Sequence, residues 1–188
     1  MRWSPVLFAI FALPTLGAEV AGVKVDDAIR LESSELVLNG AGLRTKAFFK
    51  VYVAGLYLAQ KKTNTAEVLA LPGAKRISMR LMRDLSAKQL ADALDEGIRN
   101  NTPAAEQESL QGRVAELVAI MNALQSVKEG DLIALDWLPG TGTRVVQNGE
   151  PRGKPIAGED FYRALLRIWL GDDPVSGSLK RALLGQGG

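Results

Sequence analysis

The chain has 188 residues, a length typical of a single domain that buries a sizeable core. Hydrophobic residues make up 47% and charged residues 23% of it, which is ordinary globular composition. The formal net charge of +2 is too small to imply nucleic acid or an anionic membrane as a partner. The absence of cysteine and histidine excludes disulfides, thiol nucleophiles, thiolate metal sites and serine–histidine catalysis.

The first residues have the pattern of a secretory signal peptide. Arg2 gives a short positive start, the segment 6–16 is almost wholly apolar, and small residues follow at Gly17 and Ala18. Eleven apolar residues are too few for a membrane span, which needs about twenty. We expect a signal peptide over residues 1–18, cleaved near Ala18 or Ala21, and therefore a periplasmic or secreted protein with no integral membrane segment after signal removal. An uncleaved anchor is the alternative.

The first half of the mature chain is rich in strand patterns. In chain order, these patterns predict a strand at 36–38 closed by Asn39-Gly40, one long strand or two strands meeting at a bend over 43–58, a short helical turn at 67–71, and a half-buried strand at 77–82.

Helices dominate the second half. Ser86, with Gln89 three residues later, forms a capping box that predicts a helix start. A second helix is expected through the apolar spacing of residues 110–124, then a strand at 132–138, a glycine-rich turn, a strand at 143–147 with a hairpin signal at Asn148-Gly149, and helices near 159–170 and 178–184. Because the strands and helices are segregated, we predict an α+β fold, with a layer of helices on a largely antiparallel sheet.

One arginine stands out as a candidate binding residue. Arg44 follows a run of small residues and opens an apolar strand. If that strand is regular, Arg44, Phe48 and Tyr52 share one face, although Lys46 and Lys50 have the same parity. A guanidinium beside aromatic rings in a pocket binds a carboxylate or an oxyanion well. The alternative is a surface arginine at the end of a strand.

Two stretches together resemble the chalcone isomerase-like family, in particular its bacterial exported branch. The similarity spans about residues 25–185. The stretches that carry it are Gly40-Ala41-Gly42-Leu43-Arg44 with Lys50-Val51-Tyr52-Val53-Ala54-Gly55-Leu56-Tyr57-Leu58, and Ile168-Trp169-Leu170-Gly171 with Leu183-Leu184-Gly185. The resemblance implies an open-faced β-sandwich, in which a layer of helices covers a large antiparallel sheet and leaves a cleft between them. Members of the family are either isomerases that cyclise a chalcone or non-catalytic relatives, some of which bind fatty acids.

The resemblance also assigns residues to the cleft. Arg44 falls on the active-site arginine of the family. Tyr52 replaces a threonine that holds a water in the isomerases, Leu90 replaces a tyrosine, Gly97 replaces an asparagine, and Ile168 replaces a polar residue. Because these changes remove groups that would stabilise a developing enolate, the resemblance implies a cleft that is more apolar and poorly suited to cyclisation.

Three functions are compatible with this pattern. The first is an exported non-catalytic binding protein for an amphipathic carboxylate such as a fatty acid, with no cofactor, metal or catalytic residue. The second is an isomerase-like intramolecular lyase that acts on an unknown enone. The third is a structural or interaction protein whose cleft is filled. For the first, we predict a ligand site that comprises Arg44, Tyr52, Phe48, Leu90 and Ile168.

Overall fold

A computed structural model describes residues 17–124 and 126–187. Its strands are β1 (Ala18–Val20), β2 (Val23–Val25), β3 (Ala28–Leu31), β4 (Ser34–Lys46), β5 (Phe49–Leu58), β6 (Lys75–Leu81), β7 (Leu85–Ser86), β8 (Ser126–Val127), β9 (Leu132–Leu138), β10 (Gly142–Gln147) and β11 (Glu150–Ile156). Its helices are α1 (Thr65–Ala70), α2 (Ala87–Asn101), α3 (Ala104–Asn122), α4 (Glu159–Leu170) and α5 (Gly177–Leu183).

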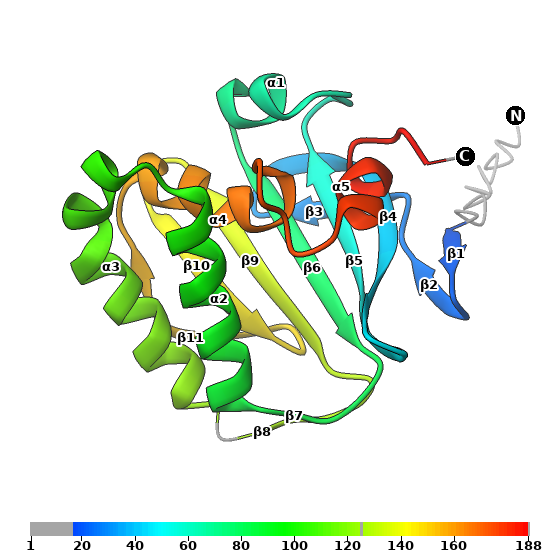
Figure 1. The fold of residues 1–188 in the computed structure, drawn as a ribbon. Helices are drawn as coiled ribbons and strands as arrows, with labels where there is room; N and C mark the ends of the chain where they lie inside the picture. Colours follow the sequence, from blue (N-terminus) through cyan, green and yellow to red (C-terminus); the bar gives the residue numbers. More distant parts are fainter. Residues whose placement is uncertain (1–16, 125, 188) are drawn as a thin grey trace, which may run out of the picture.

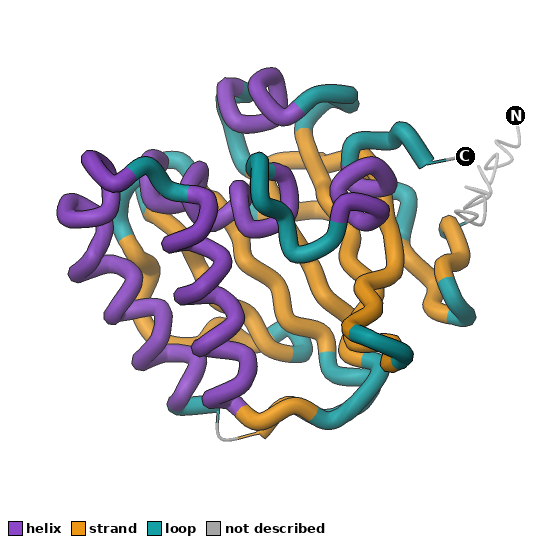
Figure 2. Tube along the Cα trace, in the orientation of Figure 1, coloured by secondary structure: helices purple, strands orange, loops and turns teal. Residues whose placement is uncertain are grey.

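Seven strands form one antiparallel sheet in the order β11-β10-β9-β6-β5-β4-β3. Helices α2, α3, α4 and α5 lie across one face of this sheet, while the hairpin β1–β2 lies beside β4 at the other end from α3 (Figure 1). Figure 2 shows the same separation of the helical layer from the strands. The predicted α+β fold, with helices on a large antiparallel sheet, is confirmed.

Local signals placed the helix that matters most for the site. The Ser86 hydroxyl accepts a hydrogen bond from the Gln89 backbone N–H at 3.1 Å, and the Gln89 side chain accepts one from the Ser86 N–H at 2.9 Å. This reciprocal pair is the predicted capping box, and it fixes the first turn of α2. The helix then buries Leu90, Leu94 and Ile98 against the sheet.

Two strand predictions near the amino end need correction. The strand predicted to close at Asn39 instead runs on to Lys46, because a bulge at Asn39 lets β4 continue. The buried Asn39 amide donates to the carbonyl oxygens of Leu183 (2.7 Å) and Lys62 (2.9 Å). The segment 43–58 holds two strands, which was one of the two alternatives, but they are joined by a tight turn and not by a bend. The chain reverses at Ala47 and the next residue, and β5 pairs back on β4.

Helix α5 sits directly on β4 because two glycines there carry no side chain. A Cβ atom on Gly40 would overlap the Ala182 carbonyl oxygen, and one on Gly42 would lie 2.7 Å from the Ala182 Cβ. The glycines near residue 40 therefore bring the carboxyl-terminal helix against the sheet. This contact joins the two stretches that were most informative in the sequence.

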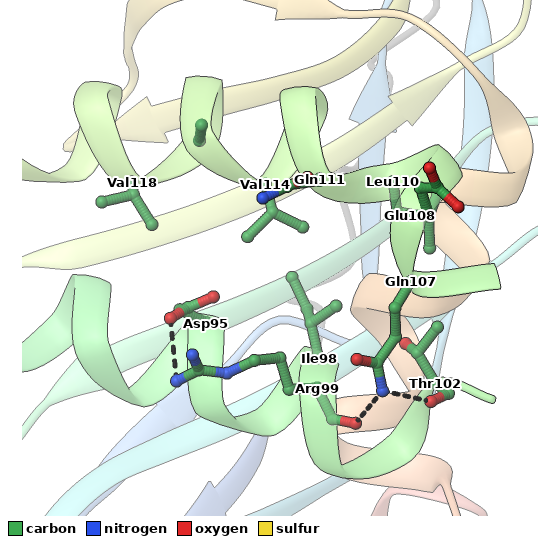
Figure 3. Close-up of a pocket in the computed structure, with 11 residues that line it drawn as sticks. Asp95, Ile98, Arg99, Thr102, Gln107, Glu108, Leu110, Gln111, Val114 and Val118 are labelled. Atoms are coloured by element: carbon green, nitrogen blue, oxygen red, sulfur yellow. Dashed lines mark hydrogen bonds and ion pairs between the residues drawn. The ribbon is translucent and has the colours of Figure 1, made fainter. Parts of the chain in front are cut away.

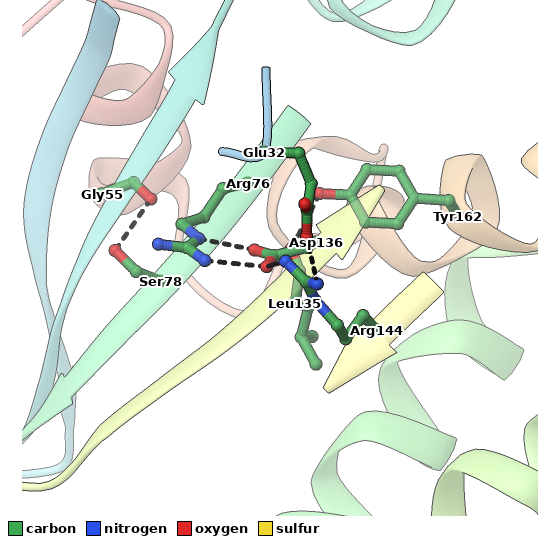
Figure 4. Close-up of polar contacts among 8 residues, drawn as sticks. All are labelled: Glu32, Gly55, Arg76, Ser78, Leu135, Asp136, Arg144 and Tyr162. Carbon is green, nitrogen blue, oxygen red and sulfur yellow. Dashed lines mark hydrogen bonds and ion pairs between the residues drawn. The ribbon is translucent and has the colours of Figure 1, made fainter. Parts of the chain in front are cut away.

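The opposite face of the sheet has its own small core and an ion-pair network that the sequence did not predict. Asp136 is completely buried between two arginines of the neighbouring strands (Figure 4). The Arg76 guanidinium donates to both Asp136 oxygens at 2.5 and 2.7 Å, and Arg144 donates to one at 3.3 Å while also pairing with Glu32 at 2.6 Å. These contacts tie β6, β9 and β10 to the turn before β4.

Lys75, at the start of β6, buries its charged amino group with no hydrogen bond among the described residues to offset the loss of water. Its side chain is 1% exposed, and its Nζ has no hydrogen-bond partner within the described ranges. Glu159 lies 3.7 Å away across the interface with α4. Burial lowers the pKa of Lys75 from its ordinary value of 10.5, and the negative charge of Glu159 opposes that shift.

We expect Lys75→Met to raise the free energy of unfolding by about 1 kcal/mol at neutral pH, because a methionine of similar length needs no ion partner. Since the folded-state pKa lies below 10.5, the cost of burying the charged lysine is full below that pKa and shrinks as pH rises toward 10.5. The stabilisation by Lys75→Met should therefore shrink as the pH rises from the folded-state pKa of Lys75 toward 10.5. Urea melts at several pH values measure it, with the exposed Lys154→Met as control. A loss of stability at neutral pH would show that the pair with Glu159 outweighs the burial cost.

None of the helices in the described ranges is long and apolar enough to cross a membrane. The predicted signal peptide lies outside the described residues except for Gly17 and Ala18, and Ala18 begins β1.

Candidate functional site

A cleft of about 490 Å³ opens between the tip of the β4–β5 hairpin and the amino-terminal half of α2. The hairpin contributes one wall, and α2 contributes the other. The lining residues are Arg44, Lys46, Ala47, Phe49, Val51, Tyr52, Arg83, Leu85, Gln89, Leu90, Asp92, Ala93 and Glu96. A volume in this range is typical of a small-molecule site.

A second β-bulge aims Arg44 into this cleft. Thr45 pairs with Lys50, but Arg44 pairs with Tyr52, so that Val51 is the extra residue on β5. Because cross-strand partners point to the same face, the bulge puts Arg44 and Tyr52 side by side on the face covered by helices. The Arg44 guanidinium carbon lies 5.5 Å from the centre of the Tyr52 ring, within cation–π range.

The Tyr52 phenol is held from behind by α4. Tyr52 is 3% exposed, and its oxygen accepts a hydrogen bond of 2.8 Å from the Trp169 indole N–H. Burial raises the pKa of Tyr52, while the positive charge of Arg44 and the Trp169 hydrogen bond oppose the rise. The phenol therefore stays protonated at neutral pH. Because Trp169 uses a lone pair of the oxygen, the phenolic hydrogen is left to donate to another group.

Arg44 has a buried donor that lacks a partner among the described residues. Its Nε is buried and has no hydrogen-bond partner in residues 17–124 or 126–187, and no described carboxylate lies within ion-pair distance of its guanidinium. A buried donor of this kind normally has a partner, because leaving it unpaired costs about 1–3 kcal/mol. The arrangement suits an anion that enters from the cleft.

The structure brings together three of the five predicted site residues. Arg44, Tyr52 and Leu90 line the cleft. Ile168 does not: it is 1% exposed and packs in the core on Gly97, where an added Cβ would lie 2.8 Å from the Ile168 side chain. Phe48 is 99% exposed in the turn, outside the cleft lining. The prediction that Phe48 shares a strand face with Arg44 and Tyr52 is wrong because the chain reverses at Ala47 and Phe48.

Two parts of the site, Trp169 and Arg83, have no signal in the sequence that marks them as site residues. Trp169 belonged to a recognised motif, but its bond to Tyr52 joins residues 117 positions apart and has no local signal. Arg83 stacks on Phe49, with its guanidinium carbon 4.9 Å from the ring centre. The alternation of the strand before Arg83 ends at that point, so nothing in the sequence distinguished it from a surface arginine.

A second groove of similar size, about 500 Å³, lies between α2 and α3 (Figure 3). Its arginine, Arg99, is already paired with Asp95 at 3.0 Å. Gln107 there donates to the carbonyl oxygens of Arg99 and Thr102 at 3.1 and 2.9 Å. The groove thus lacks an unpaired cation like Arg44. In the part of the chain that the structure describes, no cluster of three or more acidic side chains could hold a metal ion.

The sequence of the chain matches the model of the chalcone isomerase-like family over residues 17–185, and the chain belongs to that family. Among solved structures, a fatty-acid-binding protein of Arabidopsis thaliana superposes with a TM-score of 0.68 at 17% sequence identity, covering 87% of this chain and 92% of the plant protein. At this identity the likeness establishes a common fold. A search of curated protein sequences found no significant match.

Proposed function

We propose that this protein binds an amphipathic carboxylate, such as a fatty acid, with the carboxylate held by Arg44. The observation that carries the proposal is the buried, unpartnered Nε of Arg44 on the wall of an open cleft. A carboxylate there would form a charge-assisted pair with the guanidinium, and the phenolic hydrogen of Tyr52 would supply a second donor. The plant relative with the same fold, described as a fatty-acid-binding protein, supports this class of ligand.

The apolar part of the ligand has a defined path in this proposal. Behind Tyr52 the core is closed by Trp169 and by the packing of Ile168 on Gly97, so the tail does not enter between α4 and the sheet. It runs instead along Val51, which lines the cleft with Leu85, Leu90 and Ala93. These side chains lead from Arg44 along the groove between the hairpin and α2.

The cleft keeps two adjacent donors, Arg44 and Tyr52, but the other positions that the family resemblance assigns to catalytic groups carry no donor. Leu90 lines the cleft but has no hydrogen-bond donor in its side chain. Gly97 and Ile168 pack against each other in the core and offer no donor to the cleft. Cyclisation of a chalcone requires donors that stabilise a developing enolate, and removing one such donor typically costs about a hundredfold in rate. We therefore propose a binding role in preference to an isomerase. The predicted export would place that role in the periplasm or outside the cell.

Arg44→Leu should lower the affinity for a long-chain carboxylate about tenfold to a hundredfold, because a charge-assisted hydrogen bond is worth about 1.5–3 kcal/mol. The melting temperature of the delipidated protein should change little or rise, since a buried unpaired donor is removed. Titration with dodecanoate by calorimetry measures the effect. Arg99→Leu, which removes an equal charge outside the cleft, is the matched control.

Dodecanol, which has the same chain without the carboxylate, should bind the original protein and the Arg44→Leu variant equally. Unchanged dodecanoate affinity together with a much lower melting temperature would make Arg44 a structural residue and remove the polar anchor of the proposal. A chalcone absorbance assay tests the isomerase alternative, which turnover of about 1 per second or faster would favour.

A further inference from the structure

The tip of the β4–β5 hairpin exposes two adjacent phenylalanines. Phe48 is 99% exposed and Phe49 is 60% exposed, and within the described ranges the one other exposed large apolar residue is Val37, at 36%. Lys46 pairs with Phe49 across the turn, where Ala47 adopts a left-handed conformation with φ 53°. The turn therefore projects Phe48 away from the protein. Burying such side chains in an apolar environment is favourable, so their exposure points to a surface that is covered in use.

The same tip is locally basic, although the whole chain is nearly neutral. Lys46, Lys50 and Arg83 are exposed around the two rings, and none of them forms an ion pair within the part of the chain that the structure describes. Arg83 lies over the Phe49 ring.

The nearest acids offset little of this charge. Asp84 pairs with Lys128 at 3.1 Å, and Asp92 pairs with Lys88 at 2.6 Å. Glu96 stands on the α2 side of the cleft, across from the hairpin. The tip therefore combines two exposed phenylalanine side chains with three surrounding basic residues that form no ion pair among the described residues.

We propose that this tip docks the protein on the surface of an anionic lipid bilayer, with the two phenylalanine rings in the interface and the surrounding lysines and arginine against the head groups. Aromatic rings favour the region between head groups and acyl chains, and basic residues next to them are attracted by anionic lipid.

The size of the tip favours a bilayer over a protein partner. One phenylalanine buries at most about 250 Å². Two rings therefore supply well under the roughly 800 Å² that each partner contributes to a standard protein interface. A bilayer needs no complementary pocket, and its charge matches the basic ring. The docking itself does not depend on the ligand proposed for the cleft.

Docking at this tip would also orient the cleft. Lys46, Ala47 and Phe49 belong both to the tip and to the lining of the Arg44 cleft. A protein held by the tip therefore presents the mouth of the cleft to the membrane, which is where an amphipathic carboxylate would enter or leave. This consequence, unlike the docking, rests on the proposed function.

The absence of cysteine allows a local test on the full chain. Ala47→Cys carries an environment-sensitive dye at the tip, and Lys61→Cys, in the loop that follows the far end of β5, carries it as control. With vesicles of phosphatidylcholine and phosphatidylglycerol, we expect a blue shift and a rise in emission at position 47 and none at position 61. The response should weaken at high salt and with phosphatidylcholine alone. Adding Phe48→Ser and Phe49→Ser should weaken binding at the tip at least tenfold.

Because the dye reports from the tip, membrane binding by residues 1–18 cannot imitate this response. An unchanged dye at position 47, an equal response at position 61, or a full response in the variant with both serines would each overturn the proposal. The proposal would also be overturned if the protein did not bind vesicles but formed a dimer, and if Phe48→Ser and Phe49→Ser abolished that dimer. Arg44→Leu should keep the tip response while losing dodecanoate affinity, so that each proposal fails separately.

Discussion

Asp136→Asn is expected to lower the free energy of unfolding by about 3–5 kcal/mol, because it removes the negative partner from a buried ion-pair network. Asparagine has nearly the same shape, so the loss is electrostatic and not one of packing. Arg76 would keep a partly buried charge but lose one of its two short hydrogen bonds, because the amide of asparagine has one acceptor oxygen where the carboxylate has two. Arg144 would keep Glu32 as its one ion partner among the described residues.

Chemical denaturation measures this effect, and Asp92→Asn is the matched control. Asp92 pairs with Lys88 on the exposed surface of α2, where an ion pair contributes little. The control variant should therefore unfold almost like the original protein. If Asp136→Asn were equally stable, the buried carboxylate would not be what joins β6, β9 and β10.

Gly40→Ala is the second substitution with a large expected effect, a loss of about 2–3 kcal/mol in the free energy of unfolding. The added methyl group would overlap the Ala182 carbonyl oxygen and lie 2.8 Å from that of Leu183, and both atoms are backbone. Backbone cannot move aside by a change of rotamer. Helix α5 would have to lift from β4, which also loosens the hydrogen bond from Asn39 to Leu183.

The same substitution at Gly112 should have the opposite sign. Gly112 is exposed within α3, and an added Cβ would meet no atom within 4 Å. Alanine is favoured over glycine inside a helix by about 0.5–1 kcal/mol, so Gly112→Ala should stabilise the protein. Thermal melts of the two variants side by side make the comparison. Equal shifts in the same direction would show that glycine flexibility, and not the contact with α5, sets the effect at Gly40.

Much of the fold follows from short-range patterns. The sequence directly predicts features that involve only residues close together along the chain. These features are the Ser86 and Gln89 capping box, the Asn148-Gly149 hairpin and the apolar face of α4. The hairpin β1–β2 and the strand β3 were not predicted. Their strands are only three or four residues long, too short to establish an alternating pattern, and they are held by pairing with neighbours.

The candidate site was predicted in part. Arg44 and Tyr52 were identified from the sequence, as was Leu90, and all three line the cleft. Phe48 and Ile168 were placed by assuming a regular strand and by resemblance to the family. The reversal of the chain moved Phe48 to the tip, and packing on Gly97 put Ile168 in the core.

By itself, the sequence determined the helix that forms one wall of the site, the type of fold and the identity of the cation, because capping, periodicity and residue chemistry act over a few residues. Only the tertiary structure decided how these parts meet. The bulge at Val51 sets Arg44 opposite Tyr52, and α4 brings Trp169 to the phenol from 117 positions away. Such contacts depend on register and on packing between layers, and these are settled by the whole chain burying its apolar faces at once.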